Sequence, residues 1–198
     1  MDYRLEQALN GPAGHHAPPD ALMRDAAPWA GPVFIAIVAA WFAVGWLRGP
    51  REERRGALTA LLAAGGALLV NQGVLMLWSR PRPFDAHPDS VHTLVARSAD
   101  GSFPSDHAAA AVAIATVLLL AHRRLGLVAL AAAALVCVAR VYVGAHYPGD
   151  VLAGAVVGAG VAWIAHRPLA GPIGRVVDLM DAVLLRLRIP PRDRALSA

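Results

Sequence analysis

Three short clusters of polar residues interrupt an otherwise apolar chain, and their side chains suit the binding of an oxyanion. Each cluster stands beside a hydrophobic run long enough to cross a bilayer, where charge is costly and usually functional. Arginine guanidinium groups match phosphate oxygens in pairs and stay charged at physiological pH. A phosphate group attached to a lipid is therefore the leading candidate ligand. The clusters are Arg80-Pro81-Arg82-Pro83, Pro104-Ser105-Asp106-His107, and Arg140 with His146 and Asp150.

The second cluster predicts the start of a helix, because a long hydrophobic run follows it. Ser105 comes directly after a proline and is a natural N-cap. A helix that begins there would aim its free backbone N–H groups and the positive end of its dipole at a bound anion. His107 would lie in the same first turn, close to that anion.

The third cluster combines an imidazole with a carboxylate four residues later, where another hydrophobic run begins. If Asp150 accepts from one ring nitrogen of His146, the tautomer is fixed and the other nitrogen can act as nucleophile or base. With His107 to protonate the leaving oxygen, the chain would carry a complete covalent and acid–base scheme. Arg82 and Arg140 would hold the phosphoryl group. One preorganised donor of this kind is typically worth about 3–4 kcal/mol, so the scheme does not require a metal.

The composition places the chain among integral membrane proteins. Of its 198 residues, 57% are hydrophobic and 16% are charged, which disfavours a soluble globular domain. The net charge is +4, and all 18 of the lysine and arginine positions are arginines. These stand mostly in short loops between apolar runs, which is typical of membrane topology and not of a surface that binds nucleic acid.

Five apolar runs are about long enough for a ~30 Å hydrocarbon core. We therefore predict an all-α integral membrane protein, a helical bundle of five to six transmembrane helices. We expect an interfacial helical segment over residues 1–27, a transmembrane catalytic domain over 28–167 and a cytoplasmic amphipathic tail over 168–198. The runs cover residues 29–47, 56–78, 105–121, 125–143 and 149–165.

The distribution of arginines predicts the orientation of the chain in the bilayer. The arginine-rich connections after the first, third and fifth runs fall on one side, which the positive-inside rule makes cytoplasmic. The loop over residues 79–104 and the turn over 140–150 then share the opposite side. The three polar clusters should therefore meet at one extracytoplasmic face.

Taken together, the three clusters resemble the signature of the type 2 phosphatidic acid phosphatase superfamily. The resemblance implies that His146 forms a phosphohistidine, with Asp150 orienting it and His107 as acid and then base. It also implies that the reaction needs no metal or cofactor. The implied phosphate ligands are Arg82, Arg140 and Ser105, with the backbone N–H of residue 106. The matching motifs are Arg82-Pro83, Pro104-Ser105-x-His107 and Arg140-x5-His146-x3-Asp150.

Three positions depart from the pattern of that superfamily. The lysine expected seven residues before Arg82 is Leu75 here, and we expect Arg80 to take its place at the phosphate. Ala139 stands where the third motif usually opens with serine, which removes a minor hydrogen bond. Asp106 stands where many members carry glycine. We assign Asp106 to substrate binding, while roles in tuning the neighbouring histidine or holding the loop stay open.

Longer strings, Arg-Pro-Arg-Pro-Phe and Ser-Phe-Pro-Ser-Asp-His, resemble the bacitracin-resistance branch of undecaprenyl-diphosphate phosphatases. This resemblance implies hydrolysis of undecaprenyl diphosphate to undecaprenyl phosphate and phosphate, which recycles the carrier lipid for peptidoglycan and cell-wall biogenesis. It also implies a bacterial plasma membrane location with the site on the extracytoplasmic side. The expected partners are a polyprenyl diphosphate and the bilayer, and no nucleic acid.

Two other functions stay open at this point. The chain could be a phosphatase of a glycerolipid phosphate or of another polyprenyl phosphate. It could also be a non-catalytic protein that binds or transports a lipid phosphate, although binding alone requires neither the nucleophile nor the acid. His87, Asp89 and His92 could hold a metal or be solvated loop residues, and Asn71 and Gln72 could join helices or contact substrate.

Overall fold

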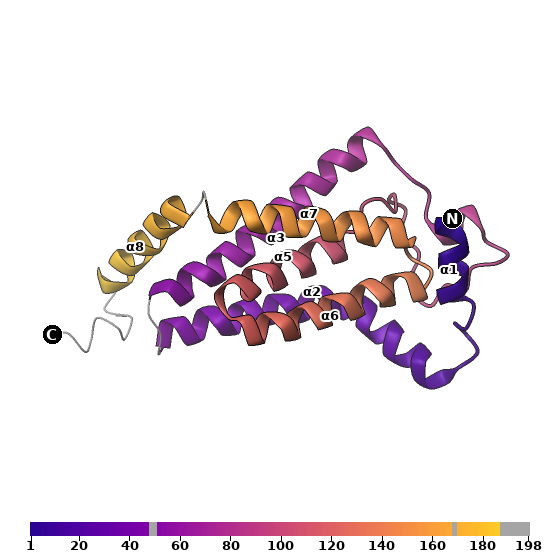
Figure 1. Ribbon diagram of the computed structural model, residues 1–198, viewed down its shortest axis with the longest axis horizontal. Helices are drawn as coiled ribbons and strands as arrows, with labels where there is room; N and C mark the ends of the chain where they lie inside the picture. Colours follow the sequence, from indigo (N-terminus) through magenta and orange to yellow (C-terminus); the bar gives the residue numbers. More distant parts are fainter. Residues whose placement is uncertain (48–50, 168–169, 187–198) are drawn as a thin grey trace.

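The computed structural model describes residues 1–47, 51–167 and 170–186. Within these ranges the regular secondary structure is entirely α-helical, and the long helices run side by side in one bundle (Figure 1). The predicted all-α class is therefore confirmed. The helices are α1 (Asp2–Asn10), α2 (Ala17–Leu47), α3 (Arg51–Leu77), α4 (Pro83–Ala86), α5 (Asp106–Ala121), α6 (Arg123–Tyr142), α7 (Pro148–His166) and α8 (Ala170–Arg186).

Among the described residues, α3, α6 and α7 are long and apolar enough to cross a membrane. Helix α2 is a fourth span if its two halves, inclined by 57°, are counted together. Pro28 and Pro32 lie inside α2, and proline bends a helix because it removes a backbone hydrogen bond and its ring clashes with the preceding turn. The chain is therefore a multi-span membrane protein, and its described residues hold three to four full-length spans, compared with the five to six that the sequence predicted. The difference lies partly in α5, which has 16 residues and is about 24 Å long.

Helix α5 forms the centre of the bundle and packs against α3, α6 and α7. Its buried face consists largely of alanines, and such small residues let helix backbones approach closely. At Gly154 of α7, a Cβ would lie only 2.4 Å from the carbonyl oxygen of Ser105, and at Gly158 only 2.2 Å from that of Ala109. Helices α5 and α7 therefore meet backbone to backbone.

The outward faces of the long helices are apolar. Large hydrophobic side chains there, such as Leu69, Val128 and Val156, are 69–75% exposed. An apolar exterior of this kind suits a surrounding of lipid, in which exposed hydrophobic residues carry no penalty.

Helix α8 is joined to the start of α3 at the end of the bundle away from α1 (Figure 1). Arg51 pairs with Asp178 at 2.6 Å, and the buried pair Arg54–Asp181 has an N–O distance of 2.9 Å. Helix α8 covers most of the amphipathic stretch that the sequence indicated. Residues 187–198 of the predicted tail, and residues 48–50 of the first arginine-rich connection, lie outside the described residues.

At the other end, α1 lies beside the outer loop between α3 and α5 and the turn between α6 and α7 (Figure 1). It packs against α6 and α7. The side-chain amide of Asn10 donates to the carbonyl oxygens of Tyr142, at 2.7 Å, and His92, at 2.8 Å. The N-terminal helix is thus attached to both polar connections at this end.

Candidate active site

The three polar clusters meet at one cavity of about 250 Å³ at the end of the bundle that carries α1. The predicted convergence of these clusters on one face is therefore observed. Leu75, at the place of the superfamily's lysine, also lines the cavity. The clusters contribute Arg82, Asp106, His107, Arg140 and His146 to its wall.

His146 lies in the turn between α6 and α7 and is 2% exposed. Its Nδ1 atom is 2.8 Å from the carbonyl oxygen of Ser102. Since a carbonyl can only accept, Nδ1 carries the hydrogen and Nε2 keeps its lone pair. The nearest oxygen of Asp150, which we expected to orient the ring, is 3.8 Å from Nδ1, beyond hydrogen-bond length. The backbone of Ser102 therefore makes the contact that the sequence assigned to the carboxylate.

Two guanidinium groups flank the Nε2 atom of His146. Nη1 of Arg82 lies 3.3 Å from it, and Nη2 of Arg140 lies 3.4 Å from it. Burial, together with the charges of Arg140 and Arg82, lowers the pKa of His146 against the opposing effect of Asp150. A neutral imidazole with a free lone pair between two fixed cations can attack an electrophile whose oxygens bind those cations.

Arg82 is held in place by its other contacts. Its Nη1 donates to the carbonyl oxygen of Ala145 at 3.0 Å, and its Nε and Nη2 reach the carbonyl and carboxylate oxygens of Asp100, both at 3.1 Å. Three fixed contacts on a side chain that is 5% exposed leave its head little freedom. The guanidinium is therefore preorganised at the cavity.

Ser105 is the N-cap of α5, as predicted, and its hydroxyl oxygen accepts from the backbone N–H of Ala108 at 3.5 Å. Its own N–H donates to the carbonyl oxygen of Asp150 at 3.0 Å, so the second and third clusters are joined through the main chain. His107 follows in the first turn of α5 and lines the cavity. The positive end of α5 points to this region, as the N-cap prediction required.

Asp106 accepts hydrogen bonds from two side chains of α3. The amide of Asn71 donates to one carboxylate oxygen at 2.8 Å, and that of Gln72 approaches the other at 3.4 Å. Asn71 and Gln72 therefore join two helices, which was one of their two interpretations. All three residues also line the cavity, so contact with a ligand is compatible with this arrangement.

Arg80 does not line the cavity, in contrast to the expectation that it replaces the missing lysine. Its Nη1 donates to the carboxylates of Asp2, at 2.7 Å, and Asp150, at 2.9 Å. Its guanidinium also stacks on the ring of Tyr147, 3.7 Å from the centroid. Although partial burial opposes it, these two carboxylates raise the pKa of Arg80. The expected substitution is not supported, because carboxylates outside the cavity already hold this side chain.

The outer-loop histidines contact the N-terminal part of the chain. The ring of His87 stacks on Tyr3 with 3.7 Å between centroids, and that of His92 packs edge-on against His15. Neither histidine lines the polar cavity. Of their two interpretations, a loop role fits these contacts better than a metal site.

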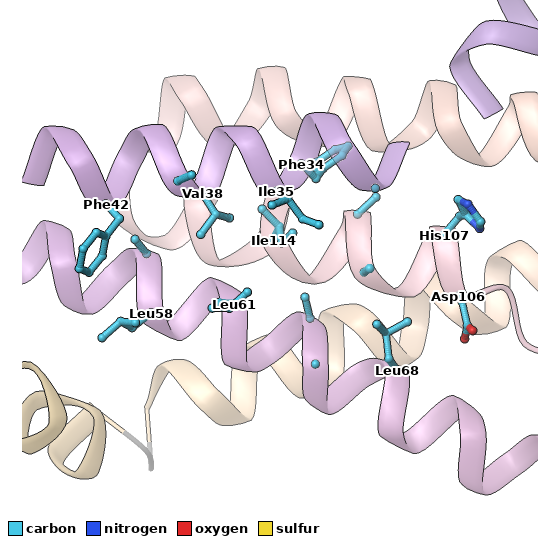
Figure 2. A pocket seen from close by; sticks show the side chains of 17 residues that line it. Phe34, Ile35, Val38, Phe42, Leu58, Leu61, Leu68, Asp106, His107 and Ile114 are labelled. Atoms are coloured by element: carbon cyan, nitrogen blue, oxygen red, sulfur yellow. The ribbon is translucent and has the colours of Figure 1, made fainter. Parts of the chain in front are cut away.

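An apolar groove of about 660 Å³ runs between α2, α3 and α5 and ends beside the polar cavity. Figure 2 shows its aliphatic and aromatic lining, with Asp106 and His107 at one end. The same two residues line the polar cavity, so the two spaces adjoin. Ile35 and Leu61 in the groove wall are more than half exposed, which places an edge of the groove on the lipid-facing surface.

Two histidines and two arginines line one cavity at the end of a membrane bundle, and side chains of these types can hold a phosphoryl group beside an imidazole. The sequence matches the family model of the PAP2 superfamily over residues 56–170, and the chain belongs to this superfamily.

Similar proteins cover between 77% and 98% of the chain. It is 32% identical to undecaprenyl-diphosphatase BcrC of Bacillus subtilis over 98% of this chain and 99% of that protein. It is 31% identical to a protein of Bacillus licheniformis named bacitracin transport permease protein BcrC, over 77% and 75% of the two chains. The crystal structure of LpxE from Aquifex aeolicus superposes with a TM-score of 0.69 at 25% identity, over 83% of this chain and 93% of that chain.

Proposed function

We propose that this chain is a membrane lipid phosphatase that hydrolyses undecaprenyl diphosphate to undecaprenyl phosphate and phosphate. The observation that carries this proposal is the cavity in which Arg82 and Arg140 flank the unprotonated nitrogen of His146. A non-catalytic phosphate site would require the cations but not a histidine prepared as a nucleophile. The similarity to a protein named undecaprenyl-diphosphatase supports the choice of substrate.

The adjoining apolar groove supports a substrate with a long hydrocarbon chain. Its volume of about 660 Å³ and its lining from α2, α3 and α5 suit an isoprenoid. Asp106 and His107 stand where the groove meets the polar cavity. In this proposal the diphosphate occupies the cavity, the isoprenoid extends into the groove, and Asp106 contacts the substrate where the two parts meet.

The proposed reaction has two steps. Nε2 of His146 attacks the terminal phosphorus while the bond to the bridging oxygen breaks, and protonated His107 gives its proton to the leaving undecaprenyl phosphate. Water then attacks the phosphohistidine, His107 takes a proton from it, the P–N bond breaks and phosphate leaves. Arg82 and Arg140 bind the transferred group in both steps, since charge on its oxygens develops between them.

Two further groups complete the proposed phosphate site. Ser105 caps α5 at its start, and the backbone N–H of residue 106 belongs to the same helix end. A helix N-terminus stabilises an anion through its free N–H groups and its dipole. Asp150, which is fully buried beside His146, supports the charge that the imidazole gains as it is phosphorylated.

We also propose that the cavity faces the extracytoplasmic side of a bacterial plasma membrane. The described arginines of the arginine-rich connections include Arg51, at the start of α3, and Arg123, at the start of α6, and they lie at the end of the bundle away from α1 and the cavity (Figure 1). Positively charged connections favour the cytoplasm. The site would then face the side of the membrane on which undecaprenyl diphosphate is released during cell-wall synthesis, which suits the recycling of this carrier lipid.

The deciding experiment measures phosphate release from undecaprenyl diphosphate by the purified full chain in detergent, with chelator present, beside His146→Ala. Undecaprenyl phosphate and a phosphatidate are tested in parallel. Substrate labelled on the terminal phosphate is quenched at short times, and the protein is examined for acid-labile, base-stable label. We expect release and label with the diphosphate, and neither with His146→Ala.

Other outcomes would contradict parts of the proposal. Release that survives His146→Ala would move the chemistry to another residue. A preference for the phosphatidate would replace the polyprenyl substrate with a glycerolipid. Binding of undecaprenyl diphosphate without any phosphate release would identify a lipid-binding or transport protein, in line with the name of the Bacillus licheniformis relative.

A further inference from the structure

Asp2, on the N-terminal helix, is linked to the first and the third cluster by one contact each, and the sequence suggested neither. One of its carboxylate oxygens accepts from Nη1 of Arg80 at 2.7 Å. The other accepts from the backbone N–H of Gly149, in the first turn of α7, at 2.8 Å. A single side chain therefore connects α1 both to the loop after α3 and to the start of α7.

Arg80 lies between two carboxylates. Its Nη1 reaches Asp2 at 2.7 Å and Asp150 at 2.9 Å, while the ring of Tyr147 covers the face of its guanidinium. Asp150 is fully buried, and burial of a charged group is costly unless an opposite charge or hydrogen bonds compensate it. Arg80 supplies that charge, and Asp2 holds Arg80 in position.

The two oxygens of Asp150 have separate partners. Oδ1 pairs with Arg80, while Oδ2 accepts from the backbone N–H of Tyr147 at 2.9 Å and lies 3.8 Å from Nδ1 of His146. Rotation of the carboxylate would break both contacts. The position of the charge behind His146 therefore depends on Arg80.

We propose that Arg80 and Asp2 are positioning residues of the phosphatase site, so that helix α1 is part of its catalytic framework. Arg80 fixes the Asp150 carboxylate behind His146, and Asp2 fixes Arg80. This inference rests on the proposed function, in which His146 is the nucleophile. It gives Arg80 a role different from the phosphate contact that we expected from its place near the missing lysine.

The charges of Asp2 and Arg80 should affect the protonation of His146 in opposite directions, and this difference can be measured. Removing the charge of Asp2 leaves Arg80 less compensated, and the added positive potential disfavours protonation of His146. Removing the charge of Arg80 leaves Asp150 unpaired, and the added negative potential favours protonation. The other charged or titratable groups facing His146 are Arg82 from the outer loop, Arg140 from α6 and His107 from α5, and they are unchanged in both variants.

The experiment compares Asp2→Asn and Arg80→Met with the wild-type chain by the pH dependence of kcat/KM for undecaprenyl diphosphate. The acid limb of this profile reports the deprotonation of the free enzyme's nucleophile. We expect the limb to move to lower pH in Asp2→Asn and to higher pH in Arg80→Met. A shift of about 0.5 unit in each direction is expected, because neither charge contacts His146 and both act on it across the intervening Asp150 carboxylate.

The kinetic parameters at optimal pH give a second readout. We expect each variant to lower kcat by about tenfold and to leave KM within about twofold, because support of a nucleophile changes the reaction step more than substrate binding. Asp2→Glu should recover part of the loss, since it restores the charge. Arg4→Gln on α1 and Asp25→Asn on α2 are matched controls, because both side chains are exposed, and both should behave as wild type.

Each outcome supports or overturns one claim. An active wild type whose two variants shift in the same direction, or not at all, would overturn the positioning role. If Arg80→Met does not fold, Asp2→Asn alone tests the proposal. A lower kcat in Asp2→Asn, with an unshifted acid limb and no recovery in Asp2→Glu, would show that the contact is only structural and would overturn the positioning role. A wild-type chain that releases no phosphate would overturn the proposed function itself.

Discussion

The imidazole of His146 donates from Nδ1 to the backbone carbonyl of Ser102 at 2.8 Å. This contact ties the turn before α7 to the loop before α5 and keeps Nε2 directed at the two arginines of the cavity. A backbone carbonyl cannot be removed by substitution of a side chain. The tautomer of His146 is therefore protected against changes elsewhere in the site, which leads to a prediction for Asp150.

We expect Asp150→Asn to lower kcat by about 10- to 100-fold but to leave measurable activity above that of His146→Ala. The Ser102 contact preserves the tautomer, while the charge that supports the imidazole and pairs with Arg80 is lost. Phosphate release at substrate saturation measures the effect. If a folded Asp150→Asn protein were as inactive as His146→Ala, the carboxylate would be indispensable in spite of the backbone contact.

Gly65→Phe should reduce the use of long-chain substrates selectively. Gly65 lines the apolar groove, and a Cβ added there meets no other atom within 4 Å, so a ring can enter without a backbone clash. We expect kcat/KM for undecaprenyl diphosphate to fall by about tenfold and that for geranyl diphosphate to change by less than about twofold, because only the long chain competes with the ring.

Gly73→Phe is the matched control, since Gly73 lies on the same helix, has the same free space around its Cβ and does not line the groove. Equal losses on both substrates, or equal effects of both substitutions, would show that the isoprenoid does not occupy the groove.

The contact between Asn71 and Asp106 should stabilise the packing of α3 on α5. Asn71 is 1% exposed and donates to the carboxylate at 2.8 Å. A double-mutant cycle with Asn71→Ala and Asp106→Ala should give a coupling energy of about 1–2 kcal/mol, as for a partly buried hydrogen bond to a charged group. The free energy of unfolding in mixed micelles is the measured quantity.

The same cycle with Gln72→Ala in place of Asn71→Ala should give less than about 0.5 kcal/mol, because that contact is 3.4 Å long and exposed. Equal coupling energies in both cycles would show that the Asn71–Asp106 contact stabilises the packing of α3 on α5 no more than the longer Gln72 contact does.

Glu6 should make the stability of the chain depend on pH. This residue of α1 is fully buried, and neither of its carboxylate oxygens has a hydrogen-bond partner in the described part of the chain. Burial raises its pKa from 4.5 to about 7. The folded state therefore holds this proton more tightly than the unfolded state, so the contribution of Glu6 to stability is fully present below about pH 4.5 and is lost as the pH rises through about 7.

We expect Glu6→Gln to be more stable than wild type at pH 8 by up to about 3 kcal/mol, and to lose this advantage at acidic pH. Thermal unfolding across this pH range measures the difference, with Asp25→Asn as an exposed control. Parallel curves for wild type and Glu6→Gln would show that the carboxylate is solvated when α1 is in place.

The parts of the site that depend on local sequence could be predicted. Ser105 is an N-cap because a serine after proline and before an apolar run has few other roles, and the structure agrees. The convergence of Arg82, His107 and His146 could be inferred because runs of membrane-spanning length return the chain to the same face at every second crossing.

The parts that depend on docking between distant segments could not be predicted. The direction of Arg80 in a loop flanked by prolines is set by Asp2, about eighty residues earlier in the chain, and no local pattern reveals that partner. The carbonyl of Ser102 has no side-chain signature at all. The sequence predicted a first run over residues 29–47, whereas helix α2 already begins at Ala17. Pro28 and Pro32 bend this helix but do not end it.

The backbone contact at Gly154 and Gly158 determines which parts of this chain can change during evolution. Because α5 and α7 touch through their main chains there, any larger side chain at either position would push the two halves of the site apart. The lipid-facing side chains on the outside of the bundle take no part in this contact. Substitutions on the exterior, such as those that would suit a membrane of different composition, therefore leave the spacing of α5 and α7 at the cavity unchanged.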